Sequence, residues 1–291
     1  MPPGYESFFG LFERPFSLTP DARYHFRSRT HARALAGLST GLARGAPLLL
    51  LTGDLGTGKS TLCRALARTF QRDTRVSYVT NALLSPDELL VRLCQDLGAV
   101  PLGETGDLDE SGTADPGQQL ASLLRNRAGR PPLVLIDEAH LLPRLTVDSV
   151  LGLTALEADG RPLVQIVLAA QPPALGSPTL PRAIEDSVVH RARLTPLDRD
   201  ECGPYIQHRF HVAGGGPIGI GARTVDVLFA LSGGIPRLVN LLCERALQEA
   251  AAVGIRRLEP SMFETAASAL DLQRLRARRF RWFGNQRAAQ A

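Results

Sequence analysis

The chain has 291 residues, of which 44% are hydrophobic and 21% are charged, so it is neither disordered nor fibrous and forms one large or two smaller globular domains. Its net charge of +4 is too small to argue for a nucleic-acid partner by itself. The N-terminus has no charged start or apolar core of a signal peptide, and no apolar run approaches the roughly 18 residues of a membrane helix, so we expect a cytoplasmic protein.

The first 30 residues are rich in aromatic residues, proline and glycine and have no regular period. We expect an irregular arm over residues 1–30 that packs on the following domain, where its aromatic side chains either wall an adenine pocket or join the core. Apolar residues at helical spacing in residues 31–44 predict a helix that leads into the first strand.

A glycine-rich turn separates the apolar run 48–51 from a segment with helical periodicity, residues 62–70. The turn has the G-x-x-x-x-G-K-S pattern of a phosphate-binding loop in its strand–loop–helix context, and it consists of Gly53, Asp54, Leu55, Gly56, Thr57, Gly58, Lys59, Ser60 and Thr61. Its glycines allow backbone N–H groups to point at phosphate oxygens, and the helix N-terminus adds a partial positive charge. We predict that Lys59, the only lysine, reaches the β- and γ-phosphates of ATP and that Ser60 ligates Mg²⁺.

Residues 76–80 alternate as a strand that ends at Asn81. Ser85, Pro86 and Glu88 predict the start of a helix that runs to about residue 97, with Ser85 as the N-cap. Residues 103–117 are acidic and glycine-rich, so we expect a solvated loop there before a further helix over 118–126.

The apolar run 133–136 ends in the carboxylates Asp137 and Glu138. A continuous apolar run fits a strand that is covered on both faces of a parallel sheet. We predict that Asp137 holds Mg²⁺ directly or through water and that Glu138 polarises the attacking water. The pair of motifs is far more specific for nucleotide hydrolysis than either motif alone.

Two further strands are predicted over residues 163–169 and 188–194. Gln171 follows the first of them and either touches the γ-phosphate or the water, or is an ordinary loop residue. Because strands and helices alternate, we predict an α/β P-loop nucleotide-binding domain over residues 31–196, with a mostly parallel sheet and ligands at the carboxyl ends of its strands.

A hinge near residue 196 leads into a small all-helical domain, residues 197–272, with helices expected over 198–212, 223–232, 235–253 and 260–272. Arg237 lies in the first turn of a helix, where a cation is disfavoured unless an anion such as a nucleotide phosphate lies nearby; it is otherwise a surface arginine. The tail, residues 273–291, carries an arginine cluster and the only tryptophan at 274–283. That cluster suits an anionic membrane surface or nucleic acid, or is a solvated helix end.

These motifs resemble the ExeA/GspA-type AAA+ ATPases, the general secretion pathway protein A family, over about residues 5–270. The segments that carry the resemblance are residues 5–16, 18–21, 53–61, 135–139, 171–172, 194–197 and 232–237. The resemblance implies an ATP-driven homo-oligomer, a ring or a filament, with a helical lid. It also implies Gln171 and Arg237 as sensors of the γ-phosphate and Asn81 as a restraint on the catalytic glutamate.

The same resemblance implies an arginine finger from a neighbouring subunit. Ser187 stands where the family usually has an arginine, so Arg191, Arg193 or Arg182 must serve, and Arg191 is favoured. A milder departure is His140, which stands where the family usually has glutamine.

Family members serve the assembly of type II secretion or pilus machines at the inner membrane, so the resemblance implies such partners and a peripheral location there. Relatives in transposition bind DNA, which makes a DNA-regulated ATPase the alternative. A third possibility is a nucleotide-gated scaffold with negligible hydrolysis, which the intact Asp137 and Glu138 disfavour. Longer members continue into a membrane helix and a peptidoglycan-binding domain. The sequence of this chain, which ends at Ala291, does not contain these segments, so a peptidoglycan role is not carried over to it.

Overall fold

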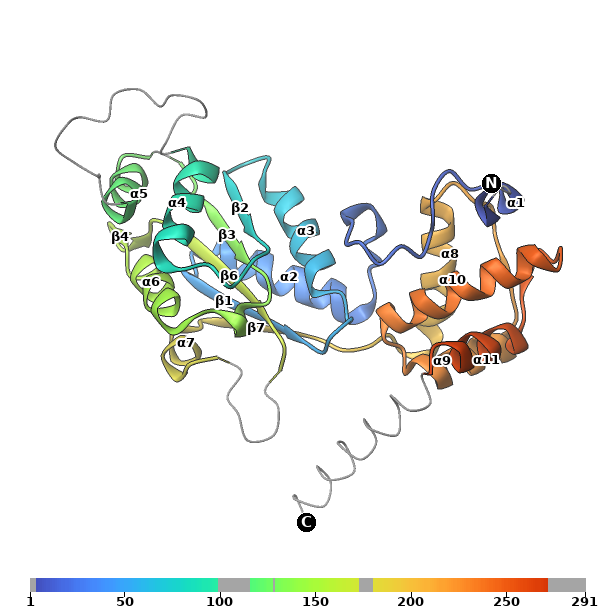
Figure 1. Cartoon of the computed structure of the whole chain (residues 1–291). Coiled ribbons are helices and arrows are strands. Elements are labelled where there is room, and N and C mark those ends of the chain that lie inside the picture. Colours follow the sequence, from blue (N-terminus) through green and yellow to red (C-terminus); the bar gives the residue numbers. More distant parts are fainter. Residues whose placement is uncertain (1–3, 99–115, 128, 173–179, 272–291) are drawn as a thin grey trace, which may run out of the picture. The chain divides into compact units, whose positions relative to one another are not determined.

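The computed structural model describes residues 4–98, 116–127, 129–172 and 180–271. The chain divides into two compact units (Figure 1): Arg29–Thr195 forms one, and the residues up to Ser28 together with those from Pro196 onward form the other. The predicted acidic loop, apart from its last two residues, and the arginine cluster 274–283 lie outside the described residues. Within the described ranges, no helix is long and apolar enough to cross a membrane.

The unit Arg29–Thr195 is built on a parallel sheet, and this confirms the predicted α/β fold class. In the described part of the chain its strands lie in the order β2-β3-β6-β1-β7, and each neighbouring pair is parallel. The strands are β1 (Leu48–Gly53), β2 (Val76–Val79), β3 (Leu133–Ile136), β6 (Gln165–Ala170) and β7 (His190–Leu194). Strand β6 begins two residues later than the apolar run 163–169 predicts, because Leu163 donates its backbone N–H to the carbonyl of Leu156 instead.

Helices cover both faces of this sheet because successive residues of a strand point to opposite sides. Leu49 and Leu51 pack with α2 and α3, whereas Leu48 and Leu50 pack with α4, α5, α6 and α7. The helices are α2 (Arg29–Ala43), α3 (Lys59–Phe70), α4 (Pro86–Leu97), α5 (Pro116–Arg125), α6 (Arg144–Thr154) and α7 (Arg182–Ser187), with the short η2 (Ala139–Leu141) and the antiparallel pair β4 (Glu157–Ala158) and β5 (Arg161–Pro162).

The predicted start of α4 is confirmed. Ser85 Oγ accepts the backbone N–H of Glu88 at 3.3 Å, and the Glu88 carboxylate accepts the backbone N–H of Ser85 at 2.7 Å. This reciprocal pair satisfies two N–H groups that the first turn of a helix leaves without helical partners.

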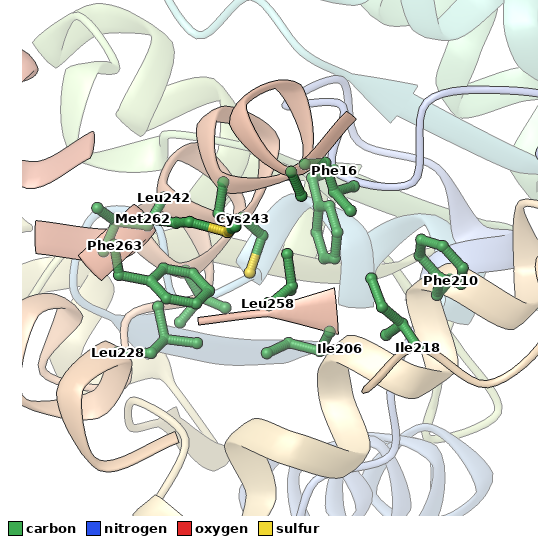
Figure 2. Packing of buried hydrophobic residues seen from close by; sticks show 14 of the residues in the cluster. Phe16, Ile206, Phe210, Ile218, Leu228, Leu242, Cys243, Leu258, Met262 and Phe263 are labelled. Carbon is green, nitrogen blue, oxygen red and sulfur yellow. The ribbon is translucent and has the colours of Figure 1, made fainter. Parts of the chain in front are cut away.

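The second unit consists mainly of helices: α8 (Arg199–Val212), α9 (Ala222–Ser232), α10 (Pro236–Ala252) and α11 (Pro260–Ala269). It is not purely helical, because β8 (Gly219–Ile220) and β9 (Arg257–Leu258) form a short parallel pair. Figure 2 shows Phe16 of the N-terminal segment packed with side chains from α8, α10 and α11 in one core. The segment itself contains α1 (Tyr5–Phe9) and the short η1 (Ala22–Tyr24).

The N-terminal segment therefore packs in the helical unit. The prediction that it packs on the domain that follows it in the sequence is wrong. Arg209 on α8 holds it there. Arg209 is 7% exposed, and its guanidinium donates to Pro15 O at 2.5 Å and to Ser17 O at 3.1 Å and lies 4.4 Å from the ring centroid of Tyr24. Carbonyl oxygens and an aromatic face thus replace the water that this buried cation loses.

Candidate nucleotide-binding site

The loop between β1 and α3 curls around its own lysine. Lys59 Nζ donates to Gly53 O at 2.8 Å and lies 3.4 Å from Asp54 O. Burial lowers the pKa of this amine, while the carboxylates of Glu138, Asp137 and Asp54 act in the opposite direction. The ammonium group is therefore held by neutral carbonyl oxygens, which phosphate oxygens could replace.

A side chain on either of two glycines of this loop would displace a neighbouring side chain. A Cβ on Gly53 would lie 2.7 Å from Thr57 Oγ1 and 3.0 Å from Leu194 Cβ, and a Cβ on Gly58 would lie 2.8 Å from His31 Nε2. Gly58 also has φ of 101°, in the left-handed region, and it precedes α3 without a side-chain cap. The first-turn N–H groups of α3 are thus turned to a cradle that fits an anion such as a polyphosphate.

The acidic pair follows β3, next to β2 in the sheet. Asp137 is 5% exposed, and its Oδ1 accepts the backbone N–H of Glu138 at 3.0 Å. Its Oδ2 accepts the hydroxyl of Tyr78 at 2.8 Å, and the same hydroxyl lies 3.5 Å from Ser60 O. The phosphate loop, through the backbone carbonyl of Ser60, and the acidic pair therefore meet at Tyr78. The hydroxyl of Ser60 and the carboxylate of Asp137 are oxygen ligands of the kind that Mg²⁺ takes beside phosphate oxygens.

No motif in the sequence marks Tyr78 as a site residue. On the alternating strand 76–80 it is one half-buried aromatic residue, and nothing in its neighbours marks its hydroxyl as functional. Only the strand order, which places β2 beside β3, brings that hydroxyl to Asp137.

The backbone at Glu138 turns sharply, with φ of 49° and ψ of 38° in the left-handed region that non-glycine residues rarely adopt. Gln171, which follows β6, donates to Glu138 Oε2 at 3.4 Å, and His140 Nε2 lies 3.4 Å from the same oxygen. Asn81 is exposed and accepts the backbone N–H of Leu83 at 3.0 Å. Gln171 and His140 thus both contact the Glu138 carboxylate.

The predicted arginines are exposed. Arg191 lies opposite Leu50 on β7, and its guanidinium donates to Glu185 O on α7 at 2.5 Å. Arg193 on β7 and Arg182 on α7 are also exposed. Arg237 lies in the first turn of α10 in the helical unit, as predicted, and its side chain is exposed there.

The chain is similar in sequence to AAA-type proteins. Residues 43–176 match the family model described as an AAA domain. The chain is 37% identical over 258 residues to general secretion pathway protein A of Aeromonas hydrophila. The match covers 87% of this chain and 46% of that protein, so the chain spans about half of the relative's length.

Solved structures with the same fold are much more distant in sequence. Cdc6p from Pyrobaculum aerophilum is 16% identical, with a TM-score of 0.67 over 87% of this chain and 69% of that one. The ORC1 protein of Aeropyrum pernix in complex with DNA is 19% identical, with a TM-score of 0.65 over 89% and 70% of the two chains. The Thermotoga maritima RuvB Holliday junction branch migration motor is 16% identical, with a TM-score of 0.55 over 88% and 72%. At these identities the structures show the fold alone.

Proposed function

We propose that this chain is an AAA-type P-loop ATPase similar to general secretion pathway protein A, and that it binds ATP with Mg²⁺ at residues 53–61 and hydrolyses it to ADP and phosphate. The observation that supports this most directly is the meeting of the two nucleotide motifs at one hydroxyl. Tyr78 Oη lies 2.8 Å from Asp137 Oδ2 and 3.5 Å from Ser60 O. Two motifs that are 77 positions apart in numbering, Ser60 and Asp137, thus form one site.

Each side chain has a role that its chemistry supports. Lys59 would exchange the carbonyl oxygens of its own loop for phosphate oxygens of ATP. Ser60 and Asp137 would hold Mg²⁺, which neutralises charge on the phosphates when it is bound. Glu138 would accept a proton from the attacking water, and Gln171, already in contact with Glu138, would orient that water or the γ-phosphate.

Hydrolysis would drive or regulate the assembly of a type II secretion or pilus-type envelope machine through nucleotide-dependent oligomerisation. The name of the relative supports the secretion role. In this proposal Arg191 would act as the arginine finger of a neighbouring subunit, and Arg237 of the helical unit would sense the γ-phosphate. Such a protein would work on the cytoplasmic side of the inner membrane, with residues 274–283 suited to an anionic lipid surface.

The alternative is a DNA-binding ATPase that regulates transposition or another DNA transaction. The observation that favours it is the fold shared with a protein solved in complex with DNA. The arginines of residues 274–283 would then contact phosphates of the DNA backbone.

Steady-state ATP hydrolysis at several protein concentrations, with and without duplex DNA, separates the two proposals. The secretion-type proposal predicts that the rate of ATP hydrolysis rises more than proportionally with protein concentration and does not change when DNA is added. Stimulation by DNA that fades as salt rises would instead support the alternative, because phosphate contacts release counterions. A rate strictly proportional to protein concentration would contradict completion of the site by a second subunit.

A further inference from the structure

Tyr78 lies between the two nucleotide motifs but belongs to neither of them. We propose that Tyr78 is a positioning residue that fixes the Asp137 carboxylate for the Mg²⁺ of the bound nucleotide. The inference rests on the proposed function, since it concerns the metal of the same site. Tyr78 is not a catalytic residue in this account, because it acts only through Asp137.

The two oxygens of Asp137 are held from different sides. Oδ1 accepts the backbone N–H of Glu138 at 3.0 Å, and Oδ2 accepts the hydroxyl of Tyr78 at 2.8 Å. A carboxylate offers about four lone-pair directions, so two bonds fix its plane and leave acceptor capacity for a cation. Without Tyr78, the backbone bond alone would hold the carboxylate among the residues that the structure describes, and the side chain could rotate about its terminal torsion, which has broad preferences.

Tyr78 is itself held on three sides. Its backbone pairs with Leu135 of β3, two residues before Asp137. Its ring packs against the core between the sheet and the helices α2 and α3, and the Arg64 guanidinium lies 5.2 Å from the ring centroid. Its hydroxyl lies 3.5 Å from Ser60 O, at the start of α3. The hydroxyl therefore lies between Asp137 Oδ2 and the backbone carbonyl oxygen of Ser60.

Tyr78→Phe tests the inference, because it removes the hydroxyl and keeps the ring beside Arg64. We would make it in the Glu138→Gln background, so that ATP is not consumed, and measure equilibrium ATP binding by calorimetry in EDTA and at increasing Mg²⁺. We expect ATP affinity in EDTA to stay within about twofold of the parent. The Mg²⁺ concentration that gives half of the affinity gain should rise about tenfold, the usual effect of losing one hydrogen bond to a charged group.

Tyr5→Phe is the matched control. It removes the same atom from a tyrosine whose hydroxyl donates to a carboxylate, Glu244 at 2.6 Å, in the helical unit. It should leave the Mg²⁺ dependence unchanged. If Tyr78→Phe shows the same Mg²⁺ dependence as Tyr5→Phe, the inference is wrong, even if Tyr78→Phe lowers the melting temperature.

A double-mutant cycle guards against a general loss of structure. In an Asp137→Asn background, Tyr78→Phe should no longer change the Mg²⁺ dependence, because the group it positions is gone. An equal effect in both backgrounds would contradict action through Asp137. If the Glu138→Gln parent itself binds ATP identically with Mg²⁺ and with EDTA, the proposed MgATP site fails, which is a different result from failure of Tyr78 alone.

Discussion

Replacing Gly53 by alanine should damage the phosphate loop through packing alone. The backbone φ of Gly53 is not in the left-handed region, so alanine can adopt the same backbone conformation without strain. The new Cβ would, however, lie 2.7 Å from Thr57 Oγ1, 3.0 Å from Leu194 Cβ and 3.2 Å from Leu194 O. Because a strand backbone and a buried loop residue cannot both move away, we expect a loss of about 1–3 kcal/mol in unfolding free energy.

For a unit of this size, that loss lowers the melting temperature by about 2–4 °C for each kcal/mol. The same displacement moves Gly53 O, which accepts the Lys59 ammonium, so the affinity for ATP should fall as well. Differential scanning fluorimetry with and without MgATP measures both effects, since bound ligand raises the melting temperature by mass action.

Gly152→Ala is the control for the same chemical change. Gly152 is exposed on α6 and a Cβ there would meet no atom within 4 Å. Since alanine is the better helix former, this variant should gain about 0.5 kcal/mol and keep its ATP response. The packing argument would be refuted if Gly53→Ala melted at the wild-type temperature and retained the full shift with MgATP.

Two further predictions concern stability. Arg209→Met should leave Pro15 O and Ser17 O without their donor and destabilise the helical unit by about 3 kcal/mol. The midpoint of urea unfolding should therefore fall, and limited proteolysis should release the N-terminal segment. An unchanged cleavage pattern would argue against Arg209 as the anchor of that segment. Ser85→Ala should lower the free energy of unfolding by about 1 kcal/mol, because it removes the N-cap of α4. The control Ser149→Ala on α6 should change the free energy of unfolding by no more than about 0.5 kcal/mol. Equal urea midpoints for the two variants would contradict the capping role of Ser85.

Local patterns in the sequence predicted the elements of the sheet unit well. Apolar runs that end in Gly53 or Asp137 are strands because such runs are buried on both faces, and the Ser85–Glu88 pair is a helix start because the reciprocal bonds are local. Helix α6 was missed: it begins after Pro143 without a side-chain cap, so no local signal marks its start.

Contacts between distant residues were not predictable in the same way. Arg209 binds Pro15 across 194 positions, and Tyr78 binds Asp137 across 59. The residues next to Phe16 in the sequence do not indicate in which core its side chain packs. The apolar runs of the strands are alike, so they do not indicate the order of the strands in the sheet. The N-terminal segment was therefore assigned to the wrong neighbour, and Tyr78 was not recognised.

The central claim is that one site, built from the phosphate loop and the Asp137–Glu138 pair, binds and hydrolyses ATP. The most direct measurement compares ATP binding and Mg²⁺-dependent hydrolysis in the wild type, Lys59→Ala and Glu138→Gln. We predict that Lys59→Ala loses binding, and that Glu138→Gln binds ATP within a few-fold of wild type and hydrolyses it at least about 100-fold more slowly, the usual effect of losing a general base. Wild-type turnover in Glu138→Gln, or wild-type affinity in Lys59→Ala, would contradict the account.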